Sequence, residues 1–100
     1  MYTQYKKKTD KELEKLIIVN DFYAINEFGE RLFKKEKYED ALNYFEKASD
    51  LGSDMAINNI GFYYLEIKNN LEKAEKYFLK GMEKGNVIAL NNLGIVNDRK

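Results

Sequence analysis

A six-residue phrase occurs twice in this chain, as A-I-N-N-I-G at residues 56–61 and as A-L-N-N-L-G at residues 89–94. The two copies begin 33 residues apart, and a partial copy at residues 24–26 lies 32 residues before the first. Each copy has a glycine at the same distance from its alanine, at Gly29, Gly61 and Gly94. A period of this length predicts stacked units of similar structure, because each unit buries its apolar face against its neighbours.

A second set of matches lies between the phrases, again displaced by 33 residues. Ala41, Tyr44, Phe45, Lys47 and Gly52 recur as Ala74, Tyr77, Phe78, Lys80 and Gly85. Each period therefore holds two different apolar patterns, one in the phrase and one after it. Two patterns in about 33 residues leave room for two helices and their connections.

Both patterns have helical spacing. The first, which we call the A helix, has Ile25, Phe28 and Leu32 on one face. The second, which we call the B helix, places an aromatic ring between two small residues, as Phe45 lies between Ala41 and Ala48. Small residues allow a neighbouring helix to approach closely and the ring fills the remaining space, so we expect each A helix to pair with the following B helix.

Capping residues give the expected boundaries. Gly52 follows a B helix, where a left-handed residue is favoured, and Asn86 precedes an A helix as an N-cap. Thr9 and Glu12 have the spacing of a capping box. We expect one domain over residues 1–100, all-α, an α-α superhelix of about five to six antiparallel helices. Its parts are a solvated tail (1–8), a degenerate B helix (9–19), repeat 1 (21–52), repeat 2 (53–85) and a terminal A helix (86–98).

Composition excludes several classes of function. Seventeen basic residues balance seventeen acidic ones, so no field of one sign exists to attract a nucleic acid or an anionic membrane. Cysteine and histidine are absent, which removes thiol nucleophiles, imidazole bases and nearly every zinc site. The acidic side chains alternate with lysines on helix faces, as in surface ion pairs. We expect no enzyme activity, no cofactor and no metal site.

No apolar segment has the length of a signal sequence or a membrane span, so a cytoplasmic protein is the expectation.

Two longer stretches carry a resemblance to a known family. Residues 48–61, A-S-D-L-G-S-D-M-A-I-N-N-I-G, and residues 81–94, G-M-E-K-G-N-V-I-A-L-N-N-L-G, are similar to the junctions of Sel1-like repeats, a branch of the tetratricopeptide repeat superfamily. The segment Y-E-D-A-L-N-Y-F-E-K-A instead resembles an ordinary tetratricopeptide repeat, and the glycine-rich insertion of Sel1-like repeats is missing. The resemblance implies a helical solenoid that binds a protein or peptide on its concave A-helix face.

The A-helix residues opposite the packed face predict that binding surface. They are Tyr23, Asn26, Glu30 and Phe33 in repeat 1, Met55, Asn58 and Phe62 in repeat 2, and Ile88, Asn91 and Ile95 in the terminal helix. Stacked A helices would align them in a groove with an apolar middle. For Phe33 and Phe62, packing between neighbouring helices is an equal alternative.

Asn59 and Asn92 lie at the edge of the predicted groove. In related repeat proteins, asparagine at this position pairs with the backbone of an extended peptide, and the resemblance implies the same here. The alternative is that both amides satisfy backbone groups between helices.

The terminal A helix has no B helix after it within residues 1–100, so Leu90, Leu93 and Gly94 lack the partner that covers their counterparts upstream. This predicts either self-association, for example as a homodimer, or a chain that continues. The sequence thus favours an adaptor that binds a protein or peptide. A homo-oligomeric structural unit and a small inhibitory or immunity-type protein remain alternatives.

Overall fold

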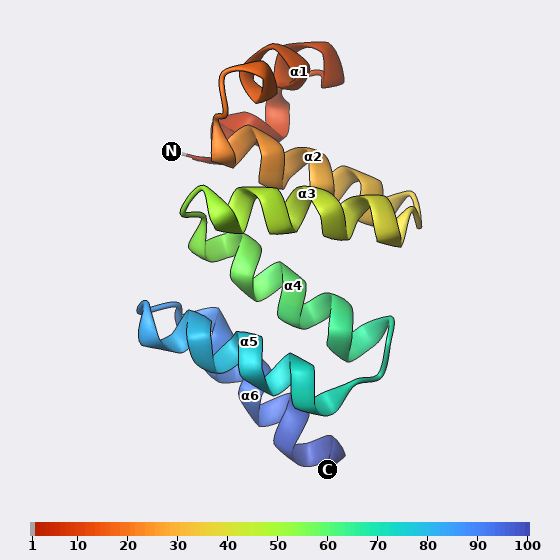
Figure 1. The fold of residues 1–100 in the computed structure, drawn as a ribbon, viewed down its shortest axis with the longest axis vertical. Coiled ribbons are helices and arrows are strands. Elements are labelled where there is room, and N and C mark those ends of the chain that lie inside the picture. Colours follow the sequence, from red (N-terminus) through yellow and green to blue (C-terminus); the bar gives the residue numbers. More distant parts are fainter. Residues whose placement is uncertain (1) are drawn as a thin grey trace. The chain divides into compact units, whose positions relative to one another are not determined.

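The computed structural model describes residues 2–100 and, within them, contains only helices. Figure 1 shows their order along the chain. They are a 3₁₀ helix η1 (Tyr2–Lys7) and six α-helices, α1 (Asp10–Ile18), α2 (Phe22–Lys34), α3 (Tyr38–Asp50), α4 (Asp54–Glu66), α5 (Leu71–Glu83) and α6 (Val87–Arg99). The all-α fold class is confirmed. The chain divides into two compact units, one ending at Ser53 and the other beginning at Asp54, one residue after the boundary between the two predicted repeats.

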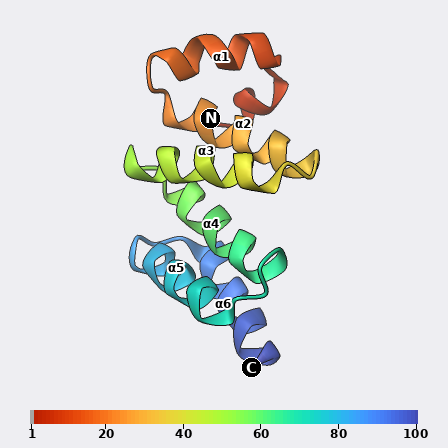
Figure 2. The same ribbon diagram turned by 45° about the vertical axis from the view of Figure 1, so that its right-hand side comes forward.

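Unit 1 is built around the hairpin of α2 and α3, which run antiparallel side by side in Figures 1 and 2. The ring of Phe45 on α3 lies against Gly29 of α2, so close that a Cβ atom on Gly29 would be 2.8 Å from Cε1 of the ring. The α1 helix packs on α2 and contributes Leu13, which is fully buried. The predicted pairing of an A helix with its B helix is thus the central contact of this unit.

Unit 2 repeats the hairpin with α4 and α5 and adds α6, which packs on both. Phe78 of α5 lies against Gly61 of α4, where an added Cβ atom would be 2.6 Å from Cε1 of the ring. The rings of Tyr64 and Tyr77 stack with centroids 5.7 Å apart. The core cluster between the helices comprises Leu65, Ala74, Phe78, Ala89, Leu93 and Val96.

The helix ends follow the predicted capping residues. Thr9 and Glu12 form the expected capping box at α1, and the Asn86 side chain accepts hydrogen bonds from the first turn of α6. Gly52 has φ of +108°, in the region that glycine adopts without steric cost. The α1 helix ends at Ile18, one residue before the predicted end of the degenerate B helix (9–19), and Asp21 caps α2.

One expectation for unit 1 is wrong. Residues 1–8 were expected to form a solvated tail; residue 1 lies outside the described residues, but η1 packs against α2. The reason is a set of polar contacts between η1 and charged side chains of α2, described below. The sequence alone does not show which charged residues pair with one another.

Candidate functional site

The two A helices of unit 2 are joined by two polar contacts. Asn92 on α6 donates from Nδ2 to Oδ1 of Asn58 on α4 over 3.0 Å, and Arg99 donates to Oε1 of Glu66 over 2.9 Å. The second contact lies two turns after the first on both helices. The helices α4 and α6 therefore run in the same direction and in register, as the repeat predicts.

Two apolar side chains lie between these contacts, one on each helix. Phe62 is one turn beyond Asn58, and Ile95 is three residues beyond Asn92. Both are 39% exposed, although each follows a residue that makes a cross-helix contact. We call the surface formed by Asn58, Phe62, Ile88, Asn91 and Ile95 the α4–α6 face. It has an apolar middle, an amide at one end and an ion pair at the other.

The predicted binding residues of unit 2 fall into three groups by exposure. Phe62, Ile88, Asn91 and Ile95 are exposed, and Met55, Asn58 and Asn59 are half-buried. Asn92 is buried, and its amide group is bonded to Asn58. The partner of the Asn92 amide is thus a side chain on the neighbouring A helix, and not one of the backbone groups that the sequence suggested.

In unit 1 the predicted groove is only partly exposed. Tyr23 is exposed as expected, but Asn26 is 3% exposed and its amide contacts Oε2 of Glu30 over 3.4 Å, so its assignment to an open groove is wrong. Phe33 is half-buried against the rings of Tyr38 and Phe45, with centroids 4.9 and 6.4 Å away. Phe33 thus belongs to the packing of the α2–α3 hairpin.

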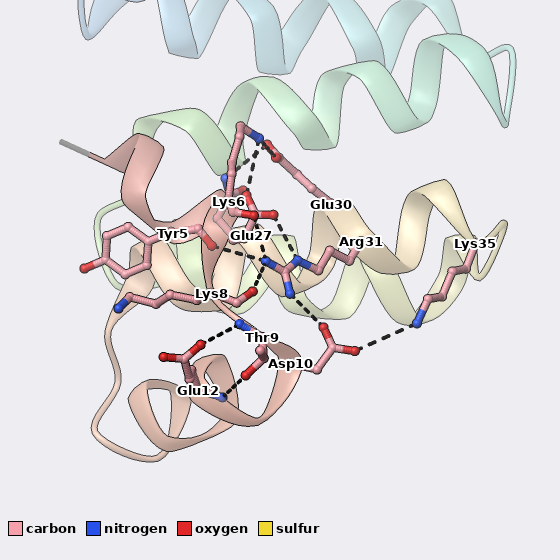
Figure 3. A network of polar contacts seen from close by, with 11 residues as sticks. Tyr5, Lys6, Lys8, Thr9, Asp10, Glu12, Glu27, Glu30, Arg31 and Lys35 are labelled. Carbon is pink, nitrogen blue, oxygen red and sulfur yellow. Dashed lines mark hydrogen bonds and ion pairs between the residues drawn. The ribbon is translucent and has the colours of Figure 1, made fainter.

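The η1 segment makes polar contacts with the same helix α2. Figure 3 shows Lys6 reaching over α2, with Nζ 3.3 Å from a carboxylate oxygen of Glu27 and 3.0 Å from one of Glu30. The hydrogen bond to Glu30 raises the pKa of Lys6 above its ordinary value, because the carboxylate stabilises the charged form of the amine. The predicted binding residue Glu30 and its neighbour Glu27 are therefore already paired with Lys6 within the chain.

Arg31 holds the same segment from the other side. Its guanidinium donates to the backbone carbonyls of Tyr5, Lys6 and Lys8, and it also contacts Asp10 over 2.8 Å (Figure 3). A fork of five donors suits several acceptors in one plane, so a single side chain fixes the connection between η1 and α1.

Tyr5 adds the last contact of η1. Its hydroxyl group donates to Asp21 over 2.8 Å, and this bond, together with burial, raises the pKa of Tyr5. The ring of Tyr5 lies 5.6 Å from that of Tyr23, centroid to centroid. The sequence analysis missed Tyr5, Lys6 and Arg31. The available signal was the group of three charges on one face of α2, Glu27, Glu30 and Arg31, which the apolar pattern did not use.

The residues predicted for self-association differ among themselves. Leu93 is buried in the core of unit 2, whereas Leu90 and Gly94 are exposed. An added Cβ atom on Gly94 would meet no atom within 4 Å. The face of α6 that carries Leu90 and Gly94 is therefore open in the described chain.

Residues 2–100 provide no group of three or more His, Cys, Asp or Glu side chains arranged to hold a metal ion. In the same part of the chain, every helix is too short or too polar to cross a lipid bilayer. No protein-family model and no curated protein matches the chain.

Proposed function

We propose that this chain is a small protein-interaction module of the Sel1-like or tetratricopeptide type, that it has no catalytic activity of its own, and that it acts in the cytoplasm. The binding surface is the α4–α6 face. One observation carries the proposal: Phe62 and Ile95 are both 39% exposed at the middle of a seam that polar contacts close at both ends. An apolar centre with a polar rim is the usual anatomy of a protein-binding surface.

The chemistry of the face indicates what it binds. Phe62 offers a rigid ring with few rotatable bonds, and covering its exposed part contributes about 1–2 kcal/mol. Asn91 is exposed on α6 and has both donors and an acceptor for a peptide backbone. Two apolar anchors and one amide suit a short peptide segment with two apolar side chains, bound weakly in the absence of further contacts.

A matched set of variants tests this surface. Phe62→Ser and Ile95→Ser remove the apolar centre, and Leu79→Ser is the control, because Leu79 is 42% exposed but lies on α5, outside the face. Peptides are selected from a displayed random library against the wild-type chain, and their affinities for all four proteins are measured by calorimetry.

We expect the selected peptides to bind the wild type and Leu79→Ser alike and to lose about tenfold or more in affinity for the other two variants. Circular dichroism checks that all four proteins keep their helicity. No enrichment of peptides against the wild type, or equal affinities for all four proteins, would contradict the proposal.

A further inference from the structure

The place on α2 that corresponds to the middle of the α4–α6 face is occupied by the chain itself. Glu30 is the ninth residue of α2, the place that Phe62 has in α4 and Ile95 has in α6. Phe62 and Ile95 are both 39% exposed. Glu30 instead has the amine of Lys6 from η1 on its carboxylate, with Nζ 3.0 Å from Oε1. The same A-helix position is therefore open in unit 2 and covered by a polar contact in unit 1.

Three kinds of contact hold η1 on α2 (Figure 3). The hydroxyl group of Tyr5 donates to Asp21, the N-cap of α2, and the amine of Lys6 pairs with two carboxylates of the helix. Arg31 donates to backbone carbonyls of η1. The helix thus contacts two side chains and the main chain of one short segment. We call the surface that η1 covers the α2 face, formed by Tyr23, Glu27, Glu30 and Arg31.

The η1 segment adds little to the core of unit 1. Residues 3–8 are all exposed or half-buried. The α1 helix, in contrast, is anchored by Leu13, which is 0% exposed. Segments with few buried apolar contacts open locally at a lower free energy than the core does. The η1 segment can therefore leave α2 while α1 stays packed.

The ion pairs of η1 and of its junction with α1 are open to water. The side chain of Lys6 is 51% exposed, and that of Asp10, which pairs with Arg31, is 49% exposed. Ion pairs that water reaches are weak, and dissolved salt screens them further. Ionic strength is therefore expected to control how firmly η1 holds to α2.

The first turn of α1 is fixed without η1. The backbone N–H of Thr9 donates to the Glu12 carboxylate over 2.8 Å, and the N–H of Glu12 donates to the Thr9 hydroxyl group over 3.2 Å. Both residues lie on the α1 side of the junction, so this capping box remains when residues 2–8 detach. The hinge of such a movement lies between Lys8 and Thr9.

We propose that η1 is a detachable strap, which opens from α2 without unfolding of the α2–α3 hairpin and, when closed, keeps the α2 face occupied. The opening rests only on contacts within unit 1. The role of the strap as an autoinhibitory contact rests on the proposed function, in which the matching positions of unit 2 bind a peptide. In the open state, the α2 face takes a segment of the same chemistry as its own occupant, a tyrosine followed directly by a lysine.

A salt titration tests the opening. NMR follows the amide shifts of the isotopically labelled chain from about 20 mM to about 500 mM NaCl, over which the Debye length falls from roughly 20 Å to roughly 4 Å. We expect the amides of residues 27–31 on α2 to shift toward those of an opened reference chain. The amide of Phe45, in the core of the hairpin, should keep its shift because the hairpin stays folded.

The opened reference is the chain with Tyr5→Ala and Lys6→Gln. These changes remove both side-chain contacts of η1 and leave every residue of α2 as it is. We expect this variant to have the open-state shifts already at low salt and to keep its helicity by circular dichroism. Lys7→Gln is the matched control, because Lys7 is an exposed neighbour that takes no part in the ion pairs to Glu27 and Glu30. It should respond to salt as the wild type does.

A peptide supplies the occupant as a separate molecule. Residues 3–8, T-Q-Y-K-K-K with blocked ends, are titrated into the wild type and into the opened variant, and the same peptide with Lys6→Gln is the control. We expect the peptide to shift the amides of residues 27–31 in the opened variant. It should bind the wild type at least about tenfold more weakly, because the tethered η1 competes at a local concentration in the millimolar range. The control peptide should shift neither chain.

Three results would overturn the proposal. One is a salt response at residues 27–31 that is no larger than the response at Phe45, since η1 would then stay bound or open only with the hairpin. Another is equal binding of the peptide to the wild type and to the opened variant. The third is the absence of binding to the opened variant. None of these measurements involves the α4–α6 face, so this proposal and the proposed function can fail separately.

Discussion

Gly61→Ala and Gly94→Ala are expected to change stability in opposite directions, although both replace the eighth residue of a 13-residue helix. The methyl group added at Gly61 would lie 2.6 Å from Cε1 and 2.8 Å from Cδ1 of Phe78. Contacts this short are not tolerated, so the ring or the helix must move. Phe78 is fully buried and its ring is rigid, which leaves it little room to do so.

The magnitude follows from two opposing contributions. Replacing glycine with alanine inside a helix stabilises it by about 0.5–1 kcal/mol, and this gain is the same at both sites because the helix positions are equivalent. Overpacking a well-filled core costs about 1–3 kcal/mol. We therefore expect Gly94→Ala to raise the free energy of unfolding by about 0.5–1 kcal/mol, and Gly61→Ala to lower it by up to about 2 kcal/mol.

Urea unfolding followed by far-UV circular dichroism measures both changes. A third variant, Gly61→Ala combined with Phe78→Leu, tests the cause, because the smaller side chain vacates the space that the methyl group needs. We expect the two substitutions to cost less together than the sum of their separate costs. Equal shifts of the urea midpoint in Gly61→Ala and Gly94→Ala would show that the ring of Phe78 does not lie against Gly61. Strictly additive changes in the free energy of unfolding for the double variant would show the same.

Three further outcomes follow from contacts in the two units. Arg31→Ala should release η1 from α2, because it removes the hydrogen bonds to three backbone carbonyls and to Asp10. Trypsin should then cleave after Lys6, Lys7 or Lys8 faster than in the wild type, while amide exchange in unit 2 stays unchanged. Asn58→Ala and Asn92→Ala should show a coupling of about 0.5–1.5 kcal/mol in a double-mutant cycle read by urea unfolding, and additivity would show that their hydrogen bond contributes nothing. The backbone and side-chain hydrogen bonds of Thr9 lower the pKa of Glu12, so the stability that its ionised form contributes is present above its ordinary pKa and is lost as the pH falls through the lowered one. Glu12→Gln should remove that part of the pH dependence below about pH 5, and an identical profile would show that the capping box does not couple to protonation.

The sequence was sufficient to predict the six α-helices of this chain and the pairing inside each hairpin, although it did not predict η1. The reason is physical: Phe45 and Phe78 are the rings that lie against Gly29 and Gly61, and each ring follows its glycine in the sequence by 16 or 17 residues. The same contact between a glycine and a phenylalanine ring therefore explains both the α2–α3 hairpin and the α4–α5 hairpin. Local capping by Thr9, Asp21 and Asn86 agrees with the same boundaries, so local and long-range signals support one fold.

The exposure of equivalent residues could not be predicted in the same way. Asn26 and Asn91 have corresponding places in the repeat, yet Asn26 is buried and Asn91 is exposed. The contacts of η1 with α2 could not be predicted either, because they depend on which of many lysines and carboxylates meet in space. Charges on flexible side chains have no spacing rule comparable to that of apolar residues, so the pairing of Lys6 with Glu27 and Glu30 is a property of the folded chain alone.

A repeat pattern therefore predicts where a close approach of two helices is possible, but not whether a ring fills the space at every copy. The internal examples make the question answerable for α6, because Gly29 and Gly61 show how a ring covers a glycine in this same chain. At those two sites an added methyl group meets a ring, whereas at Gly94 it meets nothing. Gly94→Ala is therefore expected to stabilise residues 1–100, because the methyl group adds helix propensity and meets no neighbour, whereas the same change at Gly29 or Gly61 forces a buried ring to move.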